Sequence, residues 1–544
     1  MNLRSYKILL LIVVPLILEL YAHGQVIPQS LSSTGIYEFL DELANAQLIS
    51  INSAIKPYSR LFIAEKLKEI NESKRDLLNP RQQKELDFYL LDFRKELKDE
   101  GRRGAEAQWF KGGKENKRFD LFYYRDSLFT ITVNPILGGE VFANSSGTAT
   151  YWRNGIEATS YIGRWGFYAS LRDNHEKPLL GLPGYLTTRT DGNIKGANSW
   201  EEMRGGVTWS WKWGNIGLVK DQMQWGSNYH GANIFGGNNP SYIQLRLNIK
   251  PVKWFDFNYF HGWLTSMVVD SSRSYWVTNS YGTSYREVYH KKFIAGNIFT
   301  FTPLKNLNIS AGNSIVYADI DPFPAYLVPV FFYKAIDHYV NEGIDNMNSQ
   351  AFFDISSRQI RNLHLYGTLF IDELSVPRIF RKNEWNFVSW KAGFKLSNVP
   401  VQNLSLTAEF TYTYPLAFQH YVPTLTFQTN DYNLGHYLKD NAREWYLALD
   451  YRPFRTFLIN LFFSDAIRGP DYTELGTPRI GNPPLSSIQW HNTSVGFKAT
   501  YQIINDLYTW IGFTYSDVGG DQRWSPGYLY GRKGTVNAGI TFGF

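Results

Sequence analysis

Residues 535–544 read TVNAGITFGF, and every second side chain in this stretch is apolar. In an extended strand, alternate side chains point to opposite faces. One face of this strand carries Val536, Ala538, Ile540, Phe542 and Phe544, and the other carries Thr535, Asn537, Gly539, Thr541 and Gly543. A soluble sheet seldom exposes such an apolar face in its last strand. The alternation therefore predicts a transmembrane β-barrel strand, with lipid on one side and water on the other.

The aromatic residue at the end of this strand, Phe544, carries a second indication. A terminal strand that ends in Phe resembles the signal by which outer-membrane barrels are recognised for assembly. We therefore expect the outer membrane of a Gram-negative bacterium as the location. The expected partners there are outer-membrane lipid, lipopolysaccharide and, during biogenesis, the barrel-assembly machinery.

The same two-residue period holds from Phe119 onward. Residues 243–250 alternate Ile, Leu, Leu and Ile with Gln, Arg, Asn and Lys, and similar patterns recur over 363–371 and 404–412. A soluble β-sandwich can alternate in the same way. The connections favour the barrel, because short turns and long loops take turns along the chain.

The predicted connections set the number of strands. Short turns are expected between the positions 151 and 164, 203 and 215, 241 and 252, 290 and 306, 350 and 362, 385 and 402, 443 and 454, and 490 and 507. Long polar or aromatic loops are expected over about 174–202, 265–289, 318–349, 415–442 and 464–489. Eight hairpins, an opening strand and a closing strand make about eighteen antiparallel strands, an even number with both ends periplasmic.

The composition is also that of a membrane barrel. Phe, Trp and Tyr make up 17% of the chain, with 36 Tyr and 17 Trp, while the mean hydropathy is only -0.31. Lipid-facing apolar residues that alternate with polar lumen residues produce this mixture, and Tyr and Trp form girdles at the two interfaces.

The first residues predict an export signal. Arg4 and Lys7 form a charged start, residues 8–18 an apolar core, and Ala22-His23-Gly24 a small-residue exit, so Gln25 is the expected mature N-terminus. A retained anchor helix is the alternative, but Glu19 interrupts the apolar run. No later stretch approaches the roughly 20 apolar residues of a spanning helix, which excludes a polytopic helical membrane protein.

A helical domain is predicted between the signal and the barrel. Residues 35–97 show the helical period, with an apolar stripe at Ile36, Phe39, Leu40, Leu43 and Leu48. Ser59 is expected to cap a second helix, and Asn79-Pro80 to begin a third. A basic connector follows over 94–118. The predicted organisation is therefore a signal peptide over 1–24, a periplasmic helical bundle with a basic linker over 25–118, and the barrel over 119–544.

Charge and cysteine content exclude several function classes. The chain has no cysteine, which excludes disulfides, thiolate metal sites and a lipid anchor on cysteine. Cleavage of the signal removes two basic residues and one acidic residue, so the net charge falls from +6 to +5. This charge is too small to predict a nucleic-acid partner. The remaining His and carboxylate spacings match no metal site, so neither a metal nor a cofactor is expected.

Three segments resemble the Wzi family of capsule-assembly outer-membrane proteins, in a Bacteroidetes-like form. The first is DQMQWG at 221–226 with GNNP at 237–240 and the strand 242–247. The second runs from Asp321-Pro322-Phe323 through YLVP at 326–329, FFYKA at 331–335 and Asp337-His338 to NEGIDN at 341–346. The third is LYGTLFIDE at 365–373. Most loops depart from the enterobacterial pattern, so the identity of any polysaccharide does not carry over.

The resemblance implies a non-enzymatic protein that holds capsular or exopolysaccharide at the cell surface. It also implies that surface loops bind glycan and that the helical domain seals the periplasmic mouth. A porin or export channel for sugars or polysaccharide is the alternative, since polar lumen residues suit conduction equally well. An outer-membrane hydrolase is a third possibility, but neither Asp337-His338 nor His491-Asn492 with Ser494 has a matching partner in the sequence.

Aromatic rings and planar amides are the groups that bind sugars, by stacking on ring faces and by gripping hydroxyl pairs. The glycan-binding candidates are Gln224, Trp225, Asn228, Tyr229, Asn238, Asn239 and Trp276, with His230, Tyr275 and Tyr281 beside them. The alternative role for each is packing or a membrane girdle.

A second set of residues is expected to form a charge network in the lumen. Charged residues near the strand ends of a wide barrel more often pair with Arg and Lys than act as catalysts. The candidates are Asp221, Arg246, Glu342, Asp372 and Glu373. No catalytic residue is predicted.

Overall fold

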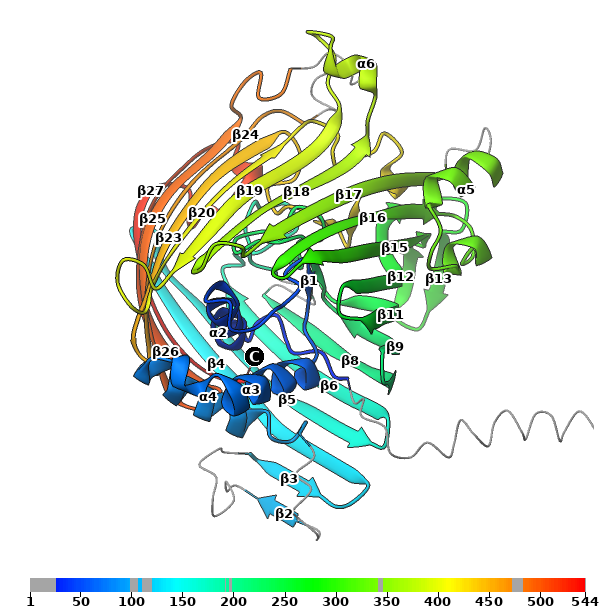
Figure 1. Ribbon diagram of the computed structural model, residues 1–544. Helices are drawn as coiled ribbons and strands as arrows, with labels where there is room; N and C mark the ends of the chain where they lie inside the picture. The colour runs from blue at the N-terminus through cyan, green and yellow to red at the C-terminus, as the bar shows by residue number, and fades with distance from the viewer. Residues whose placement is uncertain are drawn as a thin grey trace, which may run out of the picture.

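The computed structural model describes residues 26–97, 106–109, 120–190, 192–194, 198–340, 346–471 and 483–543. Its main feature is a closed antiparallel barrel of 18 strands (Figure 1). The strands are β4 Phe129–Asn144, β5 Gly147–Ile162, β6 Trp165–Lys177, β8 Ser199–Trp211, β9 Gly214–Asp221, β11 Tyr242–Val252, β12 Phe255–Val269, β15 Tyr289–Leu304, β16 Leu307–Ala318, β17 Met347–Ser357, β18 Leu363–Glu373, β19 Phe387–Ser397, β20 Leu404–Thr413, β23 Ala442–Phe454, β24 Phe457–Arg468, β25 Trp490–Ile504, β26 Leu507–Gly520 and β27 Gly531–Phe542.

The last strand closes the ring, as its alternation predicts. β27 pairs with β4 from Val536 opposite Ala143 to Phe542 opposite Leu137. Val536 and Ile540 are exposed on the outer face, while Thr535 and Thr541 are buried on the inner one. Phe544 lies outside the described residues.

All eight predicted hairpins are present. Their turns are short and lie at one end of the barrel, whereas the connections at the other end include the long loops. Asn306 and Asp506 adopt positive φ in two of these turns, at 65° and 59°, a conformation that Asn and Asp tolerate better than other side chains. We call the two ends the short-turn mouth and the long-loop end.

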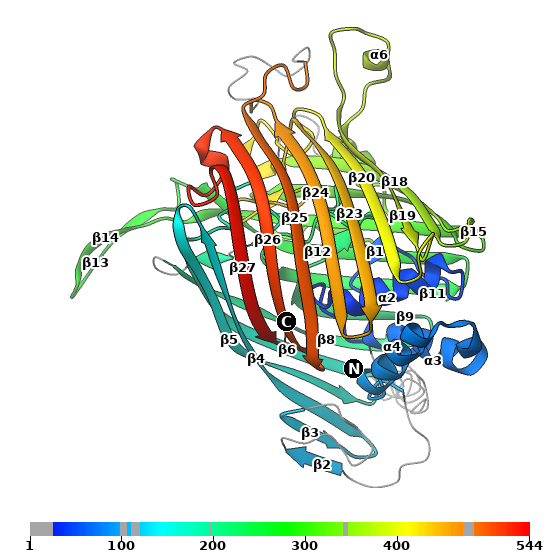
Figure 2. The ribbon, with the colours of Figure 1, turned by 90° about the vertical axis from the view of Figure 1, so that its left-hand side faces the viewer.

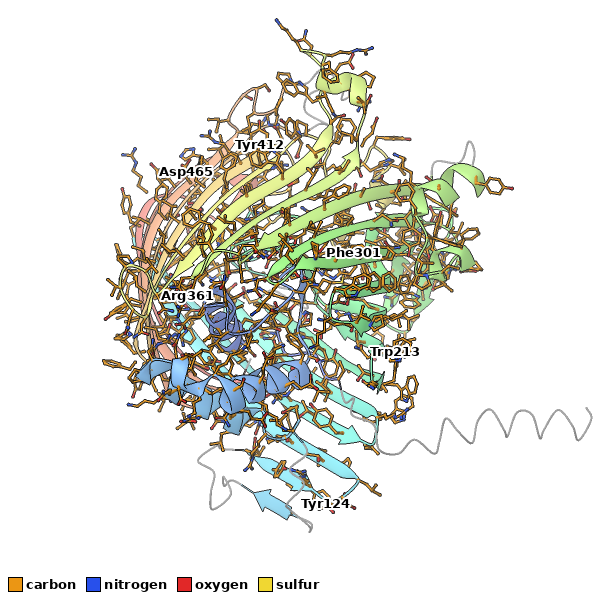
Figure 3. The ribbon with its side chains drawn as sticks, viewed as in Figure 1. Tyr124, Trp213, Phe301, Arg361, Tyr412 and Asp465 are labelled. Carbon is orange, nitrogen blue, oxygen red and sulfur yellow. The ribbon has the colours of Figure 1, made fainter. Side chains whose placement is uncertain are left out.

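The outer face carries the apolar belt of a membrane protein. Exposed apolar side chains alternate with buried polar ones along the strands, as with Val495 and Ser494 on β25. Large exposed aromatics gather near the short turns, among them Trp165, Trp213, Trp254, Phe454 and Tyr501. Figure 3 labels Trp213, in the turn after β8, and Phe301, on the outer face of β15.

The three predicted helices are confirmed: α2 Thr34–Asn45, α3 Arg60–Ser73 and α4 Pro80–Asp92. Ser59 accepts a hydrogen bond from the Phe62 amide at 3.1 Å, and Asn79 forms a capping box with Gln82. Buried apolar residues from all three helices form one core. No helix in the described part of the chain is both long and apolar enough to cross a membrane.

Part of the stretch expected as a linker is a strand. β2 Glu106–Trp109 pairs with β3 Phe122–Arg125, and β3 pairs with the start of β4. The remaining short elements are β1 Ile55–Lys56, β7 Asn193–Ile194, β10 Gln224–Trp225, β13 Tyr275–Asn279, β14 Gly282–Arg286, β21 Gln428–Thr429, β22 Tyr432–Asn433, α5 Tyr333–Val340, α6 Val376–Ile379, and the 3-10 turns η1 Arg75–Leu77, η2 Pro324–Leu327, η3 Pro423–Leu425 and η4 Gln522–Trp524.

One long loop lies against the outside of the wall. Residues 319–340, which we call the outer cap, contain η2 and α5 and pack on outward-facing residues of β12, β15 and β16. The cap buries Tyr326 and Tyr333 against Phe257, Phe293 and Tyr317. Figure 1 shows α5 outside the ring of strands. The sequence predicts only a long loop over about 318–349, so its position against the wall is a finding of the structure.

Candidate functional site

The helical domain occupies the short-turn mouth. Arg358, just after β17, pairs with Asp41 of α2 at 2.7 Å. Arg452, near the end of β23, pairs with Glu38 at 2.6 Å and with Glu85 of α4 at 3.1 Å. The ribbon places α2 within the ring of strands and α3 and α4 below it (Figures 1 and 2). Both arginines are thus used to fix the helices to the barrel.

The segment 222–241, between β9 and β11, folds into the lumen. β10 of this segment pairs with β1 of the helical domain, with Trp225 opposite Ile55. The Trp225 ring lies 5.2 Å from Phe260 and 5.8 Å from Phe352, measured between ring centroids, and the residue is only 3% exposed. Trp225 is therefore a core residue, and the expectation that it faces a glycan is not met in this structure.

A second long loop, 414–441, enters the lumen from the long-loop end. Phe418, Phe427 and Leu434 of this loop pack against Phe235 of the first segment and Phe370 of β18. Together the two loops and the inner wall form an apolar core inside the barrel. The lumen is consequently filled by protein over this part of its length.

A polar cavity of about 550 Å³ remains beside this core. We call it the lumen chamber; it lies between α2, the segment 222–241 and the inner faces of β6, β19, β20, β23 and β24. Four of the predicted glycan candidates line it: Gln224, Asn228, Tyr229 and Asn238. Asn239 is buried nearby, where its amide donates to the carbonyl of Pro240 at 2.8 Å, a contact that fixes the local backbone.

A buried ionic network holds the wall of the chamber. Glu409 of β20 accepts from the backbone amides of Tyr229 at 2.6 Å and His230 at 3.0 Å, and pairs with Lys391 at 2.8 Å. Glu444 of β23 lies 3.2 Å from His230. Sequence reasoning missed Glu409, Lys391 and Glu444. Their inward positions in alternating strands were the signal that could have found them.

The predicted charge network is only partly formed. Asp221 pairs with Arg204 at 2.7 Å and accepts from the Tyr168 hydroxyl at 2.8 Å. Arg246 instead donates to the side chain of Gln244 at 2.8 Å and to the carbonyl of Gln222 at 2.9 Å.

The other predicted charges are not part of a network across the lumen. Asp372 accepts from the Asn348 amide at 2.8 Å, so its expected pairing with a lysine or arginine is wrong. Glu373 pairs with Arg378 of α6 at 2.7 Å, in the connection that follows its own strand. Glu342 lies outside the described residues.

The long-loop end has a different character. A pocket of about 420 Å³ lies there, lined by Asp372, Glu373, Arg378, Gln419, His420 and Tyr421 among others. The hairpin of β13 and β14 projects from the barrel (Figure 2) and carries Tyr275, Trp276 at 70% exposure and Tyr281 at 98%. The candidate Trp276 and the neighbouring candidates Tyr275 and Tyr281 are therefore displayed to the exterior.

Both surfaces carry groups that can bind a ligand. Among the described residues, no three His, Asp or Glu side chains are grouped so as to hold a metal ion. Aromatic faces, amides and charged groups are present both in the lumen chamber and at the long-loop end. These are the groups that recognise sugars.

No family model and no curated protein matches the sequence. Solved structures do match. Wzi, an outer-membrane protein involved in group 1 capsule assembly in Escherichia coli, covers 96% of this chain and is covered over 100% of its own, with a TM-score of 0.59 at 11% identity. Two Pseudomonas aeruginosa proteins also match: OccD3, over 80% of this chain and 92% of its own, with 10% identity and a TM-score of 0.42, and OprD, over 76% and 94%, with 10% identity and a TM-score of 0.40. The resemblance to Wzi seen in the sequence is confirmed at the level of the fold: this chain is an 18-stranded barrel with N-terminal helices, built like that carbohydrate-binding barrel.

Proposed function

We propose that this chain is a non-enzymatic outer-membrane protein that attaches or organises capsular or exopolysaccharide at the cell surface by binding glycan. The long-loop end faces the exterior and the helical domain faces the periplasm. The apolar belt contacts outer-membrane lipid and lipopolysaccharide, and the barrel-assembly machinery inserts the chain. Wzi, whose fold this chain shares, is described as a carbohydrate-binding barrel, which supports the proposal.

The observation that carries the proposal is the contrast between the two ends of the barrel. Helices fixed by Arg358 and Arg452 occupy one mouth, and two inward loops fill part of the lumen with apolar side chains. The other end displays Trp276 and Tyr281 on a projecting hairpin. A barrel that is filled inside and aromatic outside is suited to holding a polymer at its surface.

The same observation weighs against the porin alternative. Passive conduction needs a continuous water-filled path, whereas the core around Phe235 and Phe427 lies inside the strands. We expect the purified protein to show negligible conductance in planar bilayers. Steady conductance of the wild-type protein would bring the channel alternative forward.

The first test compares native host cells with and without this chain. Cell-attached and released surface polysaccharide are measured separately, together with total export. A shift from attached to released polymer at unchanged total export is the expected result. Unchanged retention would contradict the proposal.

A second test assigns the binding surface. The double variant Trp276→Ala, Tyr281→Ala removes the two most exposed rings of the hairpin, and Tyr339→Ala removes a comparably exposed ring from α5. We expect the double variant to release polymer and Tyr339→Ala to retain it. Heat-modifiable migration on gels confirms that each variant is a folded barrel. Equal retention by both variants would place the binding surface elsewhere.

A further inference from the structure

We propose that the lumen chamber is a second binding site, which takes sugar units carrying carboxylates, and that Arg172 and Lys56 are the cations that receive these carboxylates. The inference rests on the proposed function for the class of ligand alone. It concerns the interior of the barrel, apart from the hairpin and the pocket at the long-loop end.

The size and position of the chamber fit a small ligand. Its volume of about 550 Å³ lies within the range of roughly 300–1,000 Å³ that is usual for small-molecule sites. Three separate parts of the chain line it: the helical domain, the inward segment 222–241 and the barrel wall. A ligand held there would touch all three parts at once.

The carboxylates of the chamber are already neutralised. Asp41 pairs with Arg358 at 2.7 Å, and Glu38 pairs with Arg452 at 2.6 Å. Asp450 accepts from the Asn460 amide at 2.7 Å and lies 3.9 Å from Lys395. These three carboxylates therefore already have partners and do not call for a bound cation.

Two of its cations lack such partners. Within the described part of the chain, the side chains of Arg172 and Lys56 form no hydrogen bond and no ion pair, and the buried Nε of Arg172 has no acceptor. The Lys56 ammonium lies 5.7 Å from the centroid of the Tyr37 ring. Burial lowers the pKa of Lys56, and Asp41 opposes this only in part.

A guanidinium whose buried Nε has no acceptor is costly, and a carboxylate is its natural partner, because two parallel N–H groups can donate to the two carboxylate oxygens. Arg172 is on β6 and Lys56 is on β1, and both line the chamber, so an acidic ligand held there would contact the barrel and the helical domain. The charge balance of the chamber thus points to an anionic ligand.

Rings and amides identify that anion as a sugar acid. The His230 ring is stacked on Tyr446 with 3.9 Å between centroids and 4° between planes, and both residues line the chamber. Gln224, Asn228 and Asn238 line it with amide side chains. Flat rings pack against the faces of sugar rings, and amides bind hydroxyl pairs, neither of which a simple inorganic anion requires.

The test is titration calorimetry on the full-length protein in detergent, with digalacturonic acid as the probe. The neutral disaccharide galactobiose and acetate serve as comparison ligands. We expect digalacturonic acid to bind, and Arg172→Gln and Lys56→Gln each to weaken binding by tenfold or more. Lys498→Gln, which removes a cation of β25 that does not line the chamber, is the matched control and should bind as the wild type does.

Each outcome decides the matter, with folding of every variant checked by heat-modifiable migration. Absence of binding to the wild type, undiminished binding by both chamber variants, or acetate binding as tight as digalacturonic acid would overturn the proposal. If digalacturonic acid binds in an Arg172-dependent way while host cells retain their polymer equally with and without the chain, the binding site in the chamber is supported and the proposed function is contradicted. If host cells without the chain lose retention but the purified protein binds no digalacturonic acid, the proposed function is supported and the binding site in the chamber is contradicted.

Discussion

The side-chain amide of Asn297 donates to the carbonyl oxygen of Phe331 at 2.9 Å, across the outer face of the barrel. The same amide donates to the carbonyl of Pro329 at 2.9 Å, and its oxygen accepts from Asn313 at 2.7 Å. Asn297 and Asn313 are opposite each other on β15 and β16 and point outward, with apolar residues on either side along both strands. Two amides that would otherwise face lipid are thus satisfied by the outer cap.

The first prediction concerns this contact. Asn297→Leu leaves the carbonyl of Pro329 without its donor, and the carbonyl of Phe331 keeps only the Asn313 amide at 3.4 Å. A buried unsatisfied polar group costs about 1–3 kcal/mol. We expect lower stability in urea unfolding and faster proteolysis within residues 319–340. Asn154 is the matched control, because it also points outward on β5 but is exposed between Trp152 and Ile156. Asn154→Leu should be neutral or stabilising, and equal losses in the two variants would show that the cap contact contributes nothing.

The strands and helices could be predicted because their signals are local. Hairpin turns such as Asn505-Asp506, strict alternation, and the caps at Ser59 and Asn79 each depend on neighbours within a few residues. The strand count and all eight hairpins followed from them.

The candidate site could be predicted less well, because its arrangement depends on where long loops travel. Nothing local distinguishes Trp225, which enters the lumen core, from Trp276, which stays outside. The outer cap was also hidden, since its contacts join residues from several strands. The apolar outward residue Tyr259 looks lipid-facing in sequence, yet its hydroxyl donates to the carbonyl of Tyr326 at 3.0 Å.

The second prediction tests how the helical domain is held. Arg358→Met leaves the buried Asp41 without its partner, and breaking a buried pair in this way costs about 3–5 kcal/mol. We expect protease sites in α3 and α4 to become accessible while the barrel still shows heat-modifiable migration. Arg381→Met removes an exposed pair with Glu384 and should change stability by about 0–1 kcal/mol. Unchanged protection in Arg358→Met would mean that other contacts suffice to hold the domain.

The third prediction is a pH dependence. Burial alone would raise the pKa of Glu42, but Arg81 and the amides of Asn398 and Gln82 hold it below the ordinary value of 4.5. A carboxyl with a lowered pKa stabilises the fold above its unfolded pKa, and this contribution is lost as the pH falls through the folded pKa. We therefore expect the docking of the helical domain to weaken as the pH falls below about 4.5.

Two other carboxyl groups of the helical domain have the opposite pH effect. Burial raises the pKa of both Glu38 and Glu85, so their protonation favours the fold on acidification and opposes the effect of Glu42. Comparison of Glu42→Gln with the wild type separates the contribution of Glu42 from that of Glu38 and Glu85. The variant should be less stable at neutral pH and should lose the acid-dependent decrease in protease protection. An identical pH profile in both proteins would refute the assignment to Glu42.

The fourth prediction separates a core tryptophan from a displayed one. Trp225→Ala empties a site surrounded by Phe235, Phe260 and Phe352, and truncation of a buried tryptophan costs about 3–5 kcal/mol. Trp276→Ala removes a ring that is 70% exposed, so the unfolding midpoint in urea should stay within error of the wild type. Once the amounts of folded protein are matched, cells with Trp276→Ala should retain less polysaccharide than cells with Trp225→Ala. The reason is that Trp276 belongs to the proposed binding surface, whereas Trp225 belongs to the lumen core. If Trp276→Ala lowers stability as much as Trp225→Ala, the hairpin is part of the packed structure and its rings cannot be read as a surface kept free for glycan.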